Sequence, residues 1–314
     1  MSDTNETPRQ DVYSRITNQI IEALEQGVKP WTQPWSAAHA AGHVSRPLRH
    51  NGQPYAGINV LTLWASAMTG HYAAPIWMTF KQAIELGGRV RKGEKGSPVV
   101  YADTLRRTET DEATGDEAER FIPFLKAYTV FNVEQVDDLP PHFYARAENV
   151  RNPDERIAHA EAFFAATRAD IRHGGDCAYY NPALDFIHMP AFEAFRDAQA
   201  YYATVAHEST HWTRHATRLD RDFGGKRFGD DGYSLEELVA ELGAAFLCAD
   251  LGLRLEDRDD HAAYIGHWLK VLKGDKRAIF AAAAHAQRAA DYCRVSAPPK
   301  QPPRERRPSE PTRL

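Results

Sequence analysis

Two histidines and a glutamate in the stretch AHESTHWTRHATRLD, residues 206–220, constrain the fold of this chain more than any other feature. His207, Glu208 and His211 form an H-E-x-x-H pattern within a helical repeat. The four-residue step places both imidazoles on one helix face, about 6 Å apart along the axis, where both can bind one zinc ion at roughly 2.0–2.1 Å. The carboxylate of Glu208 lies beside that pair, where it can accept a proton from water. The alternative is a polar helix face without a metal.

A third metal ligand must come from a separate helix. His215 is too distant, because its Cα would lie about 12 Å along the helix from that of His207. The metzincin pattern is excluded, since Arg214 and Thr217 stand where it requires glycine and histidine. The later segment SLEELVAELGAAFL is acidic and helical, and we predict Glu237 within it as the third ligand.

Glu237 and Glu241 also have plainer interpretations. Ser234 with Glu237 fits an S-x-x-E capping box, in which Glu237 only satisfies a backbone N–H at the helix start. Glu241 lies one turn later on the same face, as an alternative ligand, as a residue that orients a ligating histidine, or as half of a surface ion pair. The expected site is of gluzincin type.

The cysteines argue against the other common zinc sites. Cys177, Cys248 and Cys293 are isolated and never spaced C-x-x-C, so neither a zinc finger nor a nucleobase deaminase site is predicted. Metal-dependent hydrolysis of a peptide is the chemistry that remains, with zinc as the expected cofactor and another divalent ion such as Mn²⁺ as the alternative.

A hairpin is predicted close to this site. The segment CAYYNPALDFIHMP, residues 177–190, alternates around an Asn-Pro turn and favours an edge hairpin that can pair with an extended peptide. Tyr179 or Tyr180 can stabilise an oxyanion there. Packing within the hairpin is the plainer role for both tyrosines.

The amino-terminal part predicts helices followed by a long hairpin. An apolar residue at every fourth position indicates an amphipathic helix over 10–27, and a second helix is expected over 59–69. Thr79 with Gln82 fits the capping box of a short third helix. The apolar, β-branched and aromatic runs SPVVYADTLRR and FIPFLKAYTVFNV predict an antiparallel hairpin with an acidic tip.

The acids and prolines of VEQVDDLPPHFY, residues 133–144, mark a change of pattern. The fold class we predict is α+β in two domains, the first mixed α+β and the second mainly helical with an edge hairpin. The expected ranges are a first domain over 9–136, a linker over 137–153, a second domain over 154–294 and a disordered Pro/Arg tail over 295–314. The expected helices of the second domain are 154–169, 191–217, 235–250, 260–273 and 275–293.

Aromatic and basic residues alternate in the first domain. Proteins that bind single strands use cations that follow the phosphates and exposed rings that stack on the bases. Core packing and a solvated surface are the plainer roles. The candidates for DNA contact are Trp31, Trp35, Arg46, Arg49, Lys81, Arg89, Arg91, Lys92 and Lys95.

The sequence offers no feature of a membrane protein. No apolar run approaches the roughly 18 residues that span a bilayer. Residues 1–20 also lack the order of a secretory signal. We therefore expect a cytoplasmic protein without a membrane partner.

The two halves together resemble the ArdC family of plasmid antirestriction proteins. Similarity to the ArdC-type single-stranded-DNA-binding domain is carried by DVYSRITNQIIEALEQGVKPWTQPW, GINVLTLW, GGRVRKGEKGSPVVY and KAYTVFNVEQ. Similarity to a zincin-like peptidase domain is carried by ATVAHESTHWTRH and EELVAELGAAFL. The resemblance implies that the protein meets single-stranded DNA during conjugation and shields it from restriction. It names no peptidase substrate; the host restriction machinery is the candidate.

Two functions agree with these observations. The first is a zinc-dependent peptidase joined to a single-stranded-DNA-binding domain. The second is a non-catalytic protection protein that binds single strands and uses its metal only to stabilise the fold. A structural zinc site usually takes four protein ligands, whereas two histidines and one glutamate leave a position open, which favours the first function.

Overall fold

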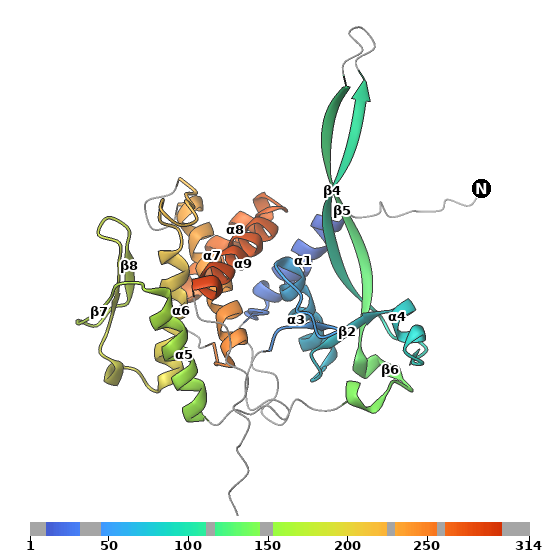
Figure 1. Cartoon of the computed structure of the whole chain (residues 1–314), viewed down its shortest axis with the longest axis horizontal. Helices are drawn as coiled ribbons and strands as arrows, with labels where there is room; N and C mark the ends of the chain where they lie inside the picture. Colours follow the sequence, from blue (N-terminus) through green and yellow to red (C-terminus); the bar gives the residue numbers. More distant parts are fainter. Residues whose placement is uncertain are drawn as a thin grey trace, which may run out of the picture.

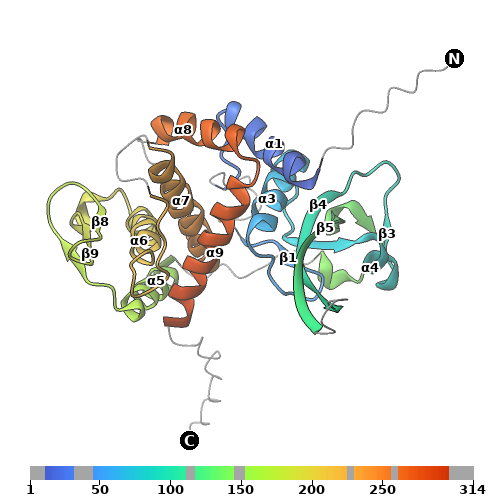
Figure 2. The ribbon, with the colours of Figure 1, turned by 90° about the horizontal axis from the view of Figure 1, so that it is seen from above.

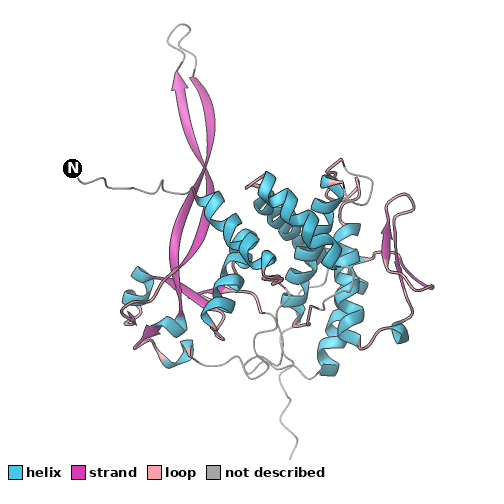
Figure 3. Ribbon diagram, turned by 180° about the vertical axis from the view of Figure 1, so that it is seen from behind, coloured by secondary structure: helices cyan, strands magenta, loops and turns pink. Residues whose placement is uncertain are grey.

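The computed structural model describes residues 11–31, 45–110, 117–144, 153–224, 230–255 and 261–296. Strands gather in the amino-terminal part and in one small sheet at the opposite side, with helices between them (Figures 1 and 3). The α+β class and the two-part organisation predicted from the sequence are therefore confirmed.

The amino-terminal part is built on a four-stranded sheet in the order β1-β2-β5-β4. Strand β1 (Leu48–Arg49) runs parallel to β2 (Ile76–Thr79), and β2 is antiparallel to β5 (Glu117–Asn132). Strand β4 (Ser97–Thr110) pairs with β5 along its whole length, which makes a long ribbon that extends away from the body (Figure 1). The predicted hairpin is thus present.

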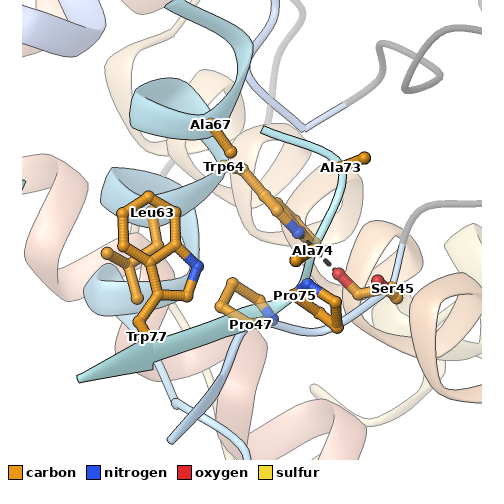
Figure 4. A pocket seen from close by; sticks show the side chains of 9 residues that line it. All are labelled: Ser45, Pro47, Leu63, Trp64, Ala67, Ala73, Ala74, Pro75 and Trp77. Carbon is orange, nitrogen blue, oxygen red and sulfur yellow. Dashed lines mark hydrogen bonds between the residues drawn. The ribbon is translucent and has the colours of Figure 1, made fainter. Parts of the chain in front are cut away.

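The helices of this part follow the sequence patterns. Helix α1 (Val12–Glu25) turns its apolar residues inward, and α3 (Ile58–Gly70) contacts both α1 and β4. Thr79 and Gln82 form the predicted capping box of α4 (Phe80–Glu85). A small pocket between α3 and β2 is lined by Leu63, Trp64 and Trp77 among other residues, and the indole of Trp64 donates there to the Ser45 carbonyl at 2.9 Å (Figure 4).

Residues 137–144, predicted as part of a linker, are instead folded onto the amino-terminal part. Strand β6 (Val136–Asp137) pairs with β3 (Arg89–Val90), and a 3-10 turn, η2 (Pro141–Phe143), follows. Leu139 and Phe143 are buried in a small core beneath β2 and α4. The prediction failed because these two apolar side chains are hidden among acids and prolines in the sequence. Residues 145–152 of the predicted linker lie outside the described ranges.

The carboxy-terminal part is mainly helical, as predicted. It contains α5 (Pro153–Thr167), α6 (Ala198–Trp212), α7 (Asp231–Leu251), α8 (His261–Gly274) and α9 (Ala278–Ser296). The helix expected over 191–217 is shorter at both ends. Asp197 caps α6 by accepting from the Ala200 amide, and after Trp212 the chain folds back in irregular turns.

A three-stranded sheet flanks α6 with the order β7-β9-β8. Strands β8 (Tyr179–Asn181) and β9 (Phe186–Met189) form the predicted hairpin, with β8 at the edge. Strand β9 is central, because β7 (Ile171–His173), which was not predicted, runs parallel to it.

The two parts share one hydrophobic core. Trp31, which follows α1, meets Trp268 of α8 edge to face at 6.0 Å between ring centroids, and Trp64 of α3 lies 5.9 Å from Phe246 of α7. Helix α1 accordingly lies beside α8 (Figure 2). Among the described residues no helix combines the length and apolar character needed to cross a membrane.

Candidate metal centre

Helices α6 and α7 bring together the three predicted metal ligands. One ligand atom from each of His207, His211 and Glu237 lies within 4.8 Å of the others. The carboxylate of Glu237 is 3.6 Å from Nε2 of His207 and 3.5 Å from Nε2 of His211. Two imidazole nitrogens and one carboxylate oxygen are the donor set of zinc-type hydrolases, in which one coordination position stays open. The residues therefore fit a divalent cation.

Carboxylates hold the far sides of both imidazoles. Nδ1 of His211 lies 3.0 Å from Oε1 of Glu236, and a proton shared there leaves Nε2 free to bind a metal. Oε1 of Glu241 lies 3.5 Å from Nδ1 of His207, which is an ion-pair contact rather than a hydrogen bond. Glu241 thus lies beside His207, and an orienting role for it stays a prediction, whereas Glu236 was not predicted.

Arg221 forms a buried, hydrogen-bonded ion pair with Glu236. Its guanidinium donates through Nε to Oε2 and through Nη2 to Oε1 of Glu236, both at 2.8 Å. It also donates to the Thr210 carbonyl at 2.9 Å and to the Thr213 hydroxyl at 3.2 Å. Only 3% of Arg221 is exposed. The guanidinium therefore ties the irregular chain after α6 to the residue that orients His211.

Electrostatics couples these groups strongly. Burial alone would lower the pKa of His211, but the charges and hydrogen bonds of Glu237 and Glu236 outweigh it and raise this pKa to about 10. Burial alone would raise the pKa of Glu236, but Arg221 and His211 lower it to about 2. Without a metal, Glu236 is therefore ionised and His211 is protonated, and a cation that binds His211 must displace that proton.

The other predicted residues of the site are placed as follows. Glu208 is buried next to His207 in α6. His215 is outside the ligand cluster, and its Nδ1 is 2.8 Å from the Thr217 hydroxyl. The hydroxyl of Tyr180 donates to Asp185 at 2.9 Å, and burial followed by this bond raises the pKa of Tyr180 to about 12. Tyr179 is exposed and stacks on His188. An oxyanion role for either tyrosine stays a prediction.

Tyr233 is a further neighbour of the ligands that the sequence did not indicate. It lies one turn before Glu237 on α7, and its hydroxyl is 3.3 Å from that of Tyr264. Burial, then the Tyr264 hydroxyl and the charge of Glu237, raise its pKa. The phenol is therefore protonated beside the third ligand.

The DNA-contact candidates divide into buried and exposed groups. Trp31 and Arg46 were candidates for DNA contact and are instead buried, Arg46 in an ion pair with Asp250 of α7 at 2.9 Å. A side chain in the core cannot reach a strand, so these two leave the candidate set. Trp35 lies outside the described residues. The other candidates are exposed. Arg49 lies over the ring of Tyr55, and Lys81, Arg89 and Arg91 form ion pairs with acids. Lys92 and Lys95 have no ion pair to any described residue.

A glycine permits the close approach of α6 and α7 on which the site depends. A Cβ at Gly243 would lie 2.4 Å from Cγ2 of Thr210, the residue before His211. Thr210 is fully buried, and its hydroxyl donates to the Ala206 carbonyl at 2.9 Å, so it cannot easily move away. The two helices must therefore separate if position 243 gains a side chain.

We expect Gly243→Ala to lower the free energy of unfolding by about 1–3 kcal/mol through overpacking. It should also weaken binding of Mn²⁺, because Glu237 moves away from the histidines. Denaturant titration and the metal-induced shift in Tm measure the two effects. Gly266→Ala in α8 is the matched control, since nothing lies within 4 Å of its added Cβ. Equal stability of the two variants would contradict the packing argument.

Comparison with known proteins assigns both parts of the chain. Residues 10–131 match the family model described as the N-terminal domain of anti-restriction factor ArdC. Residues 158–285 match the model described as a zincin-like metallopeptidase. The first match falls on the amino-terminal part of the chain and the second on the mainly helical carboxy-terminal part.

Relatives and solved structures extend this assignment. The protein y4eC of Sinorhizobium fredii is 45% identical over 92% of this chain and 93% of its own length. A DNA primase TraC of Escherichia coli is 40% identical over 89% of this chain, which spans 27% of that primase. The metal-free and Mn(II)-bound crystal structures of the antirestriction protein ArdC from plasmid R388 each superpose with a TM-score of 0.76. They are 49% and 45% identical over 91% and 93% of this chain, covering 98% and 100% of theirs.

Proposed function

This chain belongs to the ArdC family of antirestriction proteins, and from this premise we propose that it protects plasmid DNA from host restriction during conjugation. In this proposal the amino-terminal part binds single-stranded DNA, and the helical part is a metal-dependent peptidase.

One observation carries the peptidase half of the proposal. His207, His211 and Glu237 gather three metal-binding atoms, and Glu208, which directly follows the first histidine in α6, is buried. Three ligands leave a coordination position for substrate, which a structural site would fill with a fourth side chain. A divalent cation bound there would supply Lewis acidity towards a peptide carbonyl.

The residues of the chain then have distinct roles. Glu208 takes a proton from the attacking water and passes it to the leaving amine. Glu236 and Glu241 orient the two imidazoles from behind. The exposed edge of β8 is suited to pairing with an extended peptide. The substrate we propose is a protein, with the host restriction machinery as the first candidate to test.

The DNA half of the proposal is supported by the amino-terminal family match and by the similarity to the TraC primases. Within the chain it is supported by Lys92 and Lys95, which are exposed and unpaired among the described residues and so can contact phosphates.

We expect Glu208→Gln to slow hydrolysis by about a hundredfold or more, because it removes the proton acceptor. Cleavage of unfolded protein substrates by the metal-loaded chain measures this effect. The variant should keep the rise in Tm on addition of Zn²⁺ or Mn²⁺ and should keep binding to an oligonucleotide.

Glu193→Gln, an exposed acid of the same part, is the control and should cleave like the parent chain. A parent chain that cleaves nothing, together with full protection of plasmid DNA by Glu208→Gln, would reject the peptidase. Such a result would leave a strand-binding protein whose metal is structural.

A further inference from the structure

The β4–β5 ribbon is buried at its base and exposed farther along, where one of its faces carries aromatic side chains. At its base, Val99 and Val130 are buried in the core against α3. The side chain of Asn59 in α3 holds the ribbon there, with bonds of 2.7 and 2.8 Å to the backbone of Val100. Beyond this clamp the ribbon leaves the body (Figures 1 and 3).

The strand register places four residues on the continuation of the buried face. Val99 is opposite Tyr128, Tyr101 is opposite Lys126, and Asp103 is opposite Phe124, in an unbroken antiparallel ladder. Because side chains alternate between faces and directly opposed residues share a face, Tyr101, Phe124, Lys126 and Tyr128 point to the same side. We call these four residues the ribbon platform.

The ribbon platform is exposed and internally organised. Tyr101 and Tyr128 are 48% and 46% exposed, which is high for large rings. The rings of Tyr101 and Phe124 lie 6.5 Å apart, and Nζ of Lys126 lies 5.1 Å from the centre of the Phe124 ring. No ion pair joins Lys126 to a described residue, so its charge is available. Asp103, which the register places on the same face, accepts the Tyr101 hydroxyl at 2.8 Å.

The opposite face of the same stretch has a different composition. Over this stretch the register places Ala102, Leu125, Ala127 and Thr129 there, which include neither an aromatic ring nor a cation, whereas Arg106 and Phe121 lie on that face farther out along the ribbon. Within this stretch, next to the body, three rings and a lysine therefore lie together on one face. The asymmetry therefore indicates a ligand on one face.

Resting on the proposed function, we propose that the ribbon platform is the surface on which unpaired bases of single-stranded DNA stack. Phe124 and Tyr128 are four residues apart on β5, about 13 Å along the strand, and the Tyr101 ring lies across from them at 6.5 Å from the Phe124 ring. Exposed rings of this kind present faces that accept any base. Lys126 on the platform, and Lys92 and Lys95 in the turn that leads into β4, supply the positive charge that phosphates require. A duplex hides the faces of its bases, so the platform selects unpaired strands.

The test uses the full-length chain and a fluorescein-labelled oligothymidine at fixed salt, with binding followed by anisotropy. Tyr101→Ala and Tyr128→Ala should each weaken binding roughly 5- to 100-fold, and the double variant should weaken it further. Tyr101→Phe keeps the ring and should bind nearly as the parent chain does. Lys126→Gln should make the slope of log K against log salt concentration less steep, by about the amount that one phosphate contact contributes.

Phe121→Ala is the matched control. Phe121 lies on the same ribbon and is 62% exposed, but the register places it on the opposite face. It should bind the oligonucleotide as the parent chain does. The melting temperatures of all these variants should stay close to that of the parent, because the replaced side chains are exposed.

The outcomes separate this inference from the proposed function. If the parent chain binds the oligonucleotide and the double tyrosine variant binds it equally well, the platform is not the strand site, although strand binding itself stands. If the parent chain does not bind, the DNA half of the proposed function fails and the inference with it. If the variants lose only cleavage or capture of a protein substrate, the platform serves a protein and the inference is overturned.

Discussion

Replacing Arg221 with methionine is expected to lower the free energy of unfolding by about 3–5 kcal/mol, because it breaks a buried ion pair from one side. Arg221 and Glu236 are 3% and 2% exposed, and two hydrogen bonds of 2.8 Å join them. Without the guanidinium, the Glu236 carboxylate stays in the interior with His211 as its remaining charged partner. The same change leaves the Thr210 carbonyl without its donor from Arg221.

The metal site should respond to the same substitution. Glu236 orients His211, and loss of an orienting partner typically costs 10- to 100-fold in metal affinity. Arg214→Met is the control, because Arg214 lies on the same segment but only reaches Asp222 at 4.0 Å near the surface. It should change stability by less than about 1 kcal/mol. Urea denaturation and metal titration measure both effects.

A double variant, Arg221→Met with Glu236→Leu, makes the test stricter. Replacing both charges with apolar groups removes the uncompensated carboxylate and should restore most of the lost stability, although not the metal affinity. If Arg221→Met unfolds at the same urea concentration as Arg214→Met, the pair does not have the role assigned to it here.

Periodic patterns account for what the sequence predicted of this site. The step from His207 to His211 and the acidic repeat around Glu237 are read directly from helical geometry, and the structure brings these residues together. Arg221 and Glu236 were missed for different reasons. Arg221 lies in irregular turns, where no periodic pattern indicates which way its side chain points. Glu236 stands beside Glu237, and the sequence does not say which of two adjacent glutamates meets which nitrogen of His211.

Long-range contacts explain the misplaced residues of the amino-terminal part. Arg46 lies in a Gly/His/Arg-rich segment that resembles a solvated loop, yet its partner Asp250 is 204 positions away. Arg91 and Lys92 follow β3 and are exposed as expected. Local composition indicates polarity but not whether a distant helix will cover the side chain. The capping box at Thr79 was predicted correctly because all its partners lie within one turn.

Trp31→Ala is expected to destabilise the whole chain by about 3–5 kcal/mol, because it opens a large cavity in the core shared by both parts. Trp31 is fully buried and packs edge to face on Trp268, which in turn donates its indole N–H to the Ser234 carbonyl near the start of α7. The urea concentration at the unfolding midpoint should therefore fall by the same amount in two measurements. The first is far-ultraviolet circular dichroism of the whole chain, and the second is the metal-dependent protection of the helical part.

Phe121→Ala provides the comparison for the Trp31 substitution, since an exposed ring of the same part should change stability by less than about 0.5 kcal/mol. The alternative assigns Trp31 to strand binding, and it makes the opposite prediction. A Trp31→Ala chain of unchanged stability that bound oligothymidine tenfold more weakly would restore that role and would refute its place in the shared core. If the variant loses stability but still binds the strand at temperatures where it is folded, the result supports a role for Trp31 in core packing.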